Sequence, residues 1–380
     1  MTQPPPSGPW GAQPPQQPGN WQGYPGGQQG PGPQGQWNPQ QQWPSPAPAP
    51  KKGPLKWVLG AIALIAVIAV TAVVAVSCAG GNGSNNGGTP SSGSKSDVAS
   101  ANDTGPVSVI TEDPSCGPWG PINDTLANIE KNGWDKRDPS LPVTAWSADL
   151  SAQYKAVGEA LRNAADQTAP LAKLTPHRVM RELYQQYIAY IRTYADHIPT
   201  YSSADNLLIT VGGTIGTVLN DICQAIAFRS AAARGPLVGA IEPPKHVANT
   251  KGDGPPERFL SAPDPVCADW KNAIDQLSSD PAYLAWSKED SSIPASSWPP
   301  QYKAENDAIR PIFTQTADSL QKLGGQSDNP FIGDLGALAA QYGRAFIQGI
   351  PTYTTNDLYL FNVFRHAPGV VSAACEAAGV

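Results

Sequence analysis

Hydrophobic and polar residues follow three different patterns along the chain. Residues 1–50 contain no Leu, Ile, Val or Phe and no charged side chain, and they are rich in Pro, Gln and Gly. Residues 57–79 form one uncharged apolar run. Beyond residue 112, hydrophobic positions recur every three or four residues, a spacing that predicts amphipathic helices. We therefore expect several distinct parts rather than one continuous globule.

The first part, residues 1–50, cannot bury enough apolar surface to offset the entropy lost on ordering, so we predict that it is disordered. Four Trp residues are spaced along it: Trp10, Trp21, Trp37 and Trp43. Two interpretations of this low-complexity segment stay open. It is a recognition tail whose aromatic side chains make the contacts, or it is an inert spacer.

The apolar run, residues 57–79, is predicted to cross a membrane. A helix of this length extends ~34 Å at ~1.5 Å per residue, which is enough to span a bilayer core. Three lysines stand just before it: Lys51, Lys52 and Lys56. No charge follows until Lys95. The positive-inside rule then predicts a plasma-membrane protein with residues 1–50 in the cytoplasm and residues 80–380 outside.

The apolar run allows two other interpretations. A secretory signal peptide would have a shorter apolar region and fewer residues in front of it. Cys78 follows Ala75-Val76-Ser77, which loosely resembles the site at which bacterial lipoproteins are cut and acylated. Either process would also leave the downstream residues outside the cell. Residues 80–112, rich in Gly, Ser and Asn, are predicted to form a flexible stalk with a reach of ~30 Å.

The sequence beyond the stalk is duplicated at an offset of about 151–152 residues. Asp113-Pro114-Ser115-Cys116 matches Asp264-Pro265-Val266-Cys267, and Ile198-Pro199-Thr200-Tyr201 recurs from Ile350 to Tyr353. Gln153-Tyr154-Lys155-Ala156 recurs as Gln301-Tyr302-Lys303-Ala304. This last match makes Arg162 equivalent to Arg310. Further equivalent pairs are Trp146 with Trp298 and Arg192 with Arg344.

Each duplicated unit is predicted to be a bundle of about four helices, so the fold class is mostly α. Thr175-Pro176 and Asn329-Pro330 each place a capping residue before a Pro at the first position of a helix. About 110 residues are enough for a bundle with its own core. The predicted order is a tail (1–50), a basic flank and membrane helix (51–79), a stalk (80–112), repeat 1 (113–229), a Pro/Gly-rich linker (230–262) and repeat 2 (263–380).

Four Cys residues lie outside the membrane in this topology, where disulfides persist. The duplication selects one of their three pairings, Cys116–Cys223 and Cys267–Cys375, because these Cys stand at equivalent places. In the contested chain-entropy interpretation, closing each loop stabilises by about 4–5 kcal/mol. The alternative is four buried thiols. No CxxC pair occurs and no His stands beside these Cys, so we expect no metal site.

The net charge of the chain and the absence of known catalytic motifs exclude several classes of function. The chain carries a net charge of −6, and acidic residues outnumber basic ones beyond the lysine cluster, which argues against nucleic acid as a partner. HExxH and GxSxG are absent. Ser319-Leu320-Gln321-Lys322 matches SxxK, but Pro170 stands in place of the Ser in repeat 1. We therefore expect no catalytic residue and no cofactor.

Polar and aromatic residues shared by the repeats form the candidate ligand face: Arg162, Arg310, Arg192, Arg344, Trp146 and Trp298. Arg suits the phosphate of an anionic lipid or a glycan, and Trp suits a sugar or lipid platform. The alternative interpretation is that the Arg residues form ion pairs between helices and that the Trp residues belong to the core.

The WQGYPGGQQGPGPQGQW tail and the KKGPLKW entry to the apolar run resemble actinobacterial, especially mycobacterial, envelope proteins. Those proteins have a Pro/Gln/Gly-rich cytoplasmic tail, one membrane span and an extracytoplasmic domain of unknown function. The resemblance covers residues 1–80 and is one of composition, so it implies a location facing the cell wall and carries over no site residue. The repeated units resemble no characterised family.

The expected function is that of a non-enzymatic, single-pass, extracytoplasmic binding or scaffold protein of the cell envelope. Its partner would be an envelope protein, a lipid or a wall polymer. Two alternatives stay open. One is an accessory or sensory subunit that links the cytoplasmic tail to an envelope signal, and the other is an envelope hydrolase with an unrecognised site.

Overall fold

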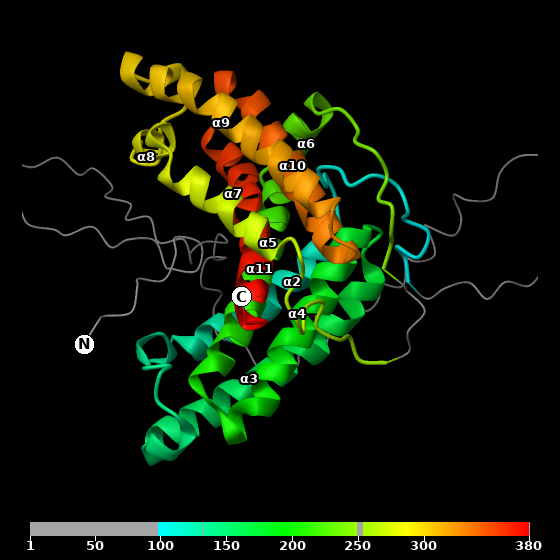
Figure 1. Cartoon of the computed structure of the whole chain (residues 1–380), viewed down its shortest axis with the longest axis vertical. Helices are drawn as coiled ribbons and strands as arrows, with labels where there is room; N and C mark the ends of the chain where they lie inside the picture. Colours follow the sequence, from blue (N-terminus) through cyan, green and yellow to red (C-terminus); the bar gives the residue numbers. More distant parts are fainter. Residues whose placement is uncertain (1–97, 132, 249–253, 380) are drawn as a thin grey trace, which may run out of the picture. The chain divides into compact units, whose positions relative to one another are not determined.

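The structure, a computed structural model, describes residues 98–131, 133–248 and 254–379 (Figure 1). The predicted tail, the apolar run 57–79 and Cys78 lie outside the described residues. The described part of the chain is helical and contains no strand, which confirms the mostly α fold class.

The two repeats contain corresponding helices in the same order (Figure 1). Repeat 1 contains α2 (Cys116–Glu130), α3 (Ala148–Leu174), α4 (Arg178–His197) and α5 (Asn206–Ala227), and the short α6 (Ser230–Arg234) follows it. Repeat 2 contains α7 (Cys267–Ser279), α8 (Pro281–Trp286), α9 (Pro300–Gly324), α10 (Pro330–Gly349) and α11 (Leu358–Ala377). A single 3-10 turn, Trp134–Lys136, stands in repeat 1 where repeat 2 has α8.

Only one of the two predicted helix starts has the predicted cap. The Asn329 side chain accepts a hydrogen bond from the backbone N–H of Phe331, and Pro330 is the first residue of α10. In contrast, α4 begins at Arg178, whose backbone N–H donates to the Asp103 carboxylate at 2.6 Å. The Thr175 hydroxyl accepts a hydrogen bond from the His177 backbone N–H at 3.2 Å, before α4 begins, and donates to Asp113. The cap of α4 therefore comes from a residue 75 positions away in the sequence.

Burial along α3 and α9 fixes how the repeats correspond. Fully buried positions of α3 recur 152 residues later in α9: Val157 and Ile309, Leu161 and Phe313, Ala165 and Ala317. Tyr154 therefore corresponds to the buried Asn306 and not to the half-buried Tyr302. The predicted equivalence of Arg162 with Arg310 is wrong by four residues. Four residues make about one helical turn, so either alignment keeps an amphipathic pattern, and only packing distinguishes them.

The two repeats pack against each other through corresponding helices, α5 against α11 and α4 against α10. The described residues of both repeats accordingly belong to one compact unit. Glu182 of α4 and Asp334 of α10 stand at equivalent positions, and their side chains meet at this contact. The two repeats therefore pack like the subunits of a two-fold symmetric dimer, because each repeat contacts the other through the same helices.

Residues 98–112, which we predicted as the end of the flexible stalk, instead lie along both repeats; we call them the leading strap. Val107, Val109 and Ile110 of the strap are buried, and this apolar surface together with its backbone hydrogen bonds holds it in place. Residues 254–263, before α7, form a second strap. Each strap crosses to the opposite repeat, because Ile110 bonds the Tyr342 hydroxyl and the Tyr190 hydroxyl donates to the Leu260 carbonyl.

Among the described residues, one helical stretch, Ser203–Ala227, is long and apolar enough to cross a membrane, with a mean hydropathy of 1.2. More than half of its most apolar window is buried. It consists mainly of α5, which packs between α4 and α11. Its apolar character is therefore that of a core helix enclosed by both repeats.

Both predicted disulfides are present, Cys116–Cys223 and Cys267–Cys375. In each repeat the bond joins the first residue of the opening helix to the last helix. The bond thus closes a loop of more than 100 residues and joins the end of a strap to the central helix pair.

The contact between α9 and α10 depends on a glycine. A Cβ on Gly336 would lie 2.5 Å from the Leu320 carbonyl oxygen, a backbone atom that cannot move aside. We expect Gly336→Ala to lower the free energy of unfolding of residues 95–380 by about 2 kcal/mol or more, as measured by chemical denaturation. Gly213→Ala in α5 is the control, because a Cβ added at Gly213 would have no neighbouring atom within 4 Å outside its own helix backbone. It should raise stability by about 0.5–1 kcal/mol, and equal losses for both variants would contradict the packing described.

Candidate functional site

Three of the four Arg residues of the candidate ligand face form ion pairs between neighbouring helices. Arg192 of α4 pairs with Asp166 of α3 at 2.5 Å. Arg344 of α10 makes the equivalent pair with Asp318 of α9 at 2.7 Å. Arg162 pairs with an aspartate in α4 and donates to a backbone carbonyl there. These contacts tie each long helix pair together.

Arg310 differs from the other three, because its half-buried guanidinium has an Nε without a hydrogen-bond partner. Trp146 stacks on Tyr154 with ring centroids 3.7 Å apart, and Trp298 stacks on Tyr353 at 5.7 Å. No hydrogen bond, ion pair or ring contact within the described residues joins any of the six predicted side chains to another. A common ligand face stays a prediction.

Sequence reasoning missed a buried group of charges where the two repeats meet. Arg178 of α4 and Asp334 of α10 are each 1% exposed. The guanidinium donates to both carboxylate oxygens, Nε at 2.6 Å and Nη2 at 3.0 Å. This is the bidentate geometry that makes Arg–carboxylate pairs strong. Five residues form what we call the central charge cluster: Asp103, Arg178, Arg181, Glu182 and Asp334.

Within the cluster, Glu182 is the residue whose pKa departs furthest from its usual value. Burial, and after it the neighbouring Asp334 carboxylate, raise the pKa of Glu182 well above its usual value. The raised pKa favours the protonated, neutral form of Glu182. With Glu182 in that form, the two remaining carboxylates, Asp103 and Asp334, balance the two guanidinium groups of Arg178 and Arg181. A cluster without net charge is the form in which buried ionic groups are tolerated.

The same arginines hold the leading strap. Arg178 Nη1 donates to the carbonyls of Asp103 at 2.7 Å and Gly105 at 3.2 Å. Arg181 donates to the Ser100 carbonyl at 3.1 Å. Farther along, side chains of both repeats bond the strap backbone at Val107, Ile110 and Glu112. The strap is thus bound as an extended peptide, mainly through its backbone carbonyls.

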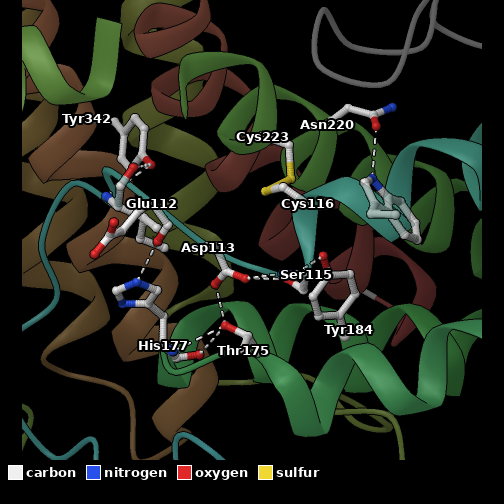
Figure 2. The surroundings of a disulfide bond; sticks show 12 residues. Glu112, Asp113, Ser115, Cys116, Thr175, His177, Tyr184, Asn220, Cys223 and Tyr342 are labelled. Atoms are coloured by element: carbon white, nitrogen blue, oxygen red, sulfur yellow. Dashed lines mark hydrogen bonds between the residues drawn. A yellow bond between two sulfur atoms is a disulfide. The ribbon is translucent and has the colours of Figure 1, made fainter. Parts of the chain in front are cut away.

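The strap ends at a network around the first disulfide (Figure 2). The Asp113 carboxylate accepts hydrogen bonds from the Ser115 backbone and hydroxyl and from the Thr175 hydroxyl. Ser115 Oγ also lies 3.0 Å from the Tyr184 hydroxyl. Cys116 follows directly and is bonded to Cys223 of α5. The repeated Asp-Pro-x-Cys motif therefore marks the point at which each strap is fixed to its bundle.

A second feature includes one of the predicted residues, Arg344. It lines an open hollow of about 480 Å³ at the end of α9. The other lining residues are Lys245, Asp318, Gln321, Lys322, Gly325 and Gln326. Lys245 belongs to the predicted linker, so the sequence did not place it near α9 and α10.

The central charge cluster left one signal in the sequence. Glu182 and Asp334 are both acidic and lie at equivalent positions, directly before the apolar Leu183 and Leu335. A shared charge within a hydrophobic stripe indicates a buried ionic contact. Arg178 and Arg181 gave no such signal, because repeat 2 has Pro330 and Gly333 in their places.

Comparison with known proteins places the structure among mycobacterial relatives. Residues 98–379 match the model of a family described as mycobacterial ESX-1 associated protein. An uncharacterised protein of Mycolicibacterium smegmatis (strain MKD8) is 42% identical over 348 residues, which cover 90% of this chain and 91% of that protein. No solved structure matches. The family match covers both repeats, whereas the resemblance noted in the sequence rested on residues 1–80.

The cluster predicts how stability depends on pH. Because Glu182 binds its proton more tightly when folded, the folded protein loses stability as pH rises from the usual Glu pKa to the raised one. Glu182→Gln keeps a hydrogen-bond donor but does not titrate. We expect the free energies of unfolding of Glu182→Gln and the natural protein to diverge by about 1.4 kcal/mol per pH unit within this window, with the variant the more stable.

The measurement is chemical denaturation of residues 95–380 between pH 5 and pH 8. Glu159→Gln, on the exposed side of α3, is the control and should follow the natural protein at every pH. A Glu182→Gln variant that is less stable by the same amount at every pH would contradict a buried, protonated Glu182.

Proposed function

Because the chain belongs to the family of mycobacterial ESX-1 associated proteins, we propose that it is a membrane-anchored scaffold that binds components of the ESX-1 secretion system in the cell envelope. In this proposal residues 57–79 cross the plasma membrane once. Residues 1–50 lie in the cytoplasm, and the two repeats lie outside. The protein acts by binding and carries out no reaction.

One observation carries the proposal: the family match, residues 98–379, coincides with a single body that its own polar side chains lock together. Arg178, Arg181 and Gln341 are used to hold the leading strap. Arg192 and Arg344 are used to hold helix pairs. Such internal locking gives a fixed surface, which lowers the entropy lost when a partner binds.

The membrane anchor has support from the sequence comparison. The Mycolicibacterium smegmatis relative matches 90% of this chain, so the unmatched part is shorter than the 56 residues that precede the apolar run. The match therefore extends across residues 57–79. The length of the apolar run and the number of residues before it fit a membrane span better than a removable leader.

A sensory role is the second candidate, and the leading strap favours it. The strap is the segment through which the predicted membrane span connects to the repeats. It contacts Arg178 and Arg181, the residues on which the repeat contact depends. A movement of the strap would therefore act directly on the central charge cluster.

The proposal predicts that ESX-1 components are captured by the tagged full chain after crosslinking in intact mycobacterial cells. Deletion of residues 1–50 should leave the capture unchanged. Arg178→Ala should reduce it, because an unpaired buried Asp334 costs about 3–5 kcal/mol and loosens both the strap and the repeat contact. Lys271→Ala, which removes an exposed ion pair within α7 and lies outside the candidate ligand face, is the control and should capture normally.

Mass spectrometry of the captured proteins is the measurement. Loss of capture on deletion of residues 1–50 would favour the sensory role, with the tail as the binding part. Absence of any ESX-1 component from the natural protein's captured fraction would overturn the scaffold proposal.

A further inference from the structure

The hollow at the end of α9 carries an excess of positive charge in an acidic part of the protein. Between residues 98 and 380, 30 acidic residues stand against 21 basic ones. The hollow reverses this balance, because Lys245, Lys322 and Arg344 line it with Asp318 as the single acidic residue. The local excess of about two positive charges needs a reason other than average composition.

The cationic groups of the hollow are not used up by internal contacts. Arg344 donates to Gln321 at 2.6 Å and to Asp318 at 2.7 Å, which fixes its orientation. A guanidinium has five N–H donors, so three remain. Asp318 is 61% exposed, and water weakens its neutralising effect. Lys245 and Lys322 make no ion pair or hydrogen bond within the described residues.

Repeat 1 provides an internal comparison. It keeps the ion pair, as Arg192 with Asp166, and it has Lys173 at the position of Gly325, but it lacks the two glutamines and the lysine that α9 and the residues after it provide in repeat 2. At offset 152 the positions of Gln321, Lys322 and Gln326 are occupied by apolar residues: Ala169, Pro170 and Leu174. An ion pair that only joined two helices would need no such additions. The additional hydrogen-bond donors therefore indicate a binding role that repeat 2 has and repeat 1 lacks.

We propose that this hollow binds a phosphate group. Arg and Lys side chains with amide donors beside them form the usual set for a phosphate oxyanion. A volume of about 480 Å³ lies within the range of small-ligand sites. The phosphate is that of a lipid headgroup or of a small soluble anion. A headgroup ligand rests on the proposed membrane anchor, whereas a soluble phosphate does not.

The test uses the full chain in phosphatidylcholine nanodiscs at low salt, with two probes. Inorganic phosphate is titrated by calorimetry, and vesicles containing phosphatidylglycerol are tested by co-flotation. Each lysine near an anionic surface contributes about 1 kcal/mol, or about fivefold in affinity. We expect Lys245→Ala/Lys322→Ala to weaken binding about 25-fold. Lys155→Ala/Lys173→Ala makes the same charge change in repeat 1 and should bind as the natural protein does.

The outcomes separate the possibilities. Binding of the vesicles alone identifies a headgroup site, and binding of inorganic phosphate identifies a site for a small anion. No binding of either probe overturns the proposal, as does an equal loss in both double variants. Lys322 also lies in the last turn of α9, so the thermal midpoint is measured in parallel. A lower midpoint with unchanged binding means that Lys322 only complements the helix dipole, which also overturns the proposal.

If residues 57–79 do not anchor the protein in a membrane, the experiment gives a result that differs from the loss of phosphate binding. A chain that does not enter nanodiscs contradicts the proposed membrane span but leaves the hollow intact. The same two probes are then applied to the chain in buffer, where the difference between the two double variants decides the phosphate site.

Discussion

The bidentate ion pair between Arg178 and Asp334 is the contact on which the rest of the structure depends. Both side chains are almost fully buried, so neither tolerates loss of its partner. Arg178 also donates to two carbonyls of the leading strap. One guanidinium therefore couples the contact between the repeats to the path of the chain that enters them. Asp103, which caps α4, completes the same arrangement.

The duplication places two acidic side chains together at the buried contact between the repeats, and the central charge cluster compensates for their repulsion. Pairing of corresponding helices brings Glu182 and Asp334 together, and two buried carboxylates cannot both be charged at such a short separation. Repeat 1 supplies two arginines, and burial together with the Asp334 carboxylate raises the pKa of Glu182, which favours its protonated form. The repeats are thus similar in backbone but different in charge. The hollow around Arg344 is a second place where repeat 2 departs from repeat 1.

These features suit a protein that works by presenting a fixed surface. Each strap forms a hydrogen bond with a tyrosine of the other repeat. The disulfides fix the ends of the straps, and the central helices of the two repeats pack against each other. Membership of the ESX-1 associated family makes a secretion system the setting in which such a surface is proposed to act. The phosphate proposal adds a ligand class that only one repeat would bind.

The sequence by itself determined the duplication, the helical fold class and the pairing of Cys116 with Cys223, because repeated spacing and cysteine positions are directly visible in it. It did not determine the alignment of α3 with α9, because a shift of four residues keeps the same face of a helix hydrophobic. It also gave no sign that residues 98–112 pack along both repeats. Only the tertiary structure decided these points. Packing of α3 against α4 and of α9 against α10 showed which positions are buried, and the strap is held by residues more than 200 positions away in the sequence.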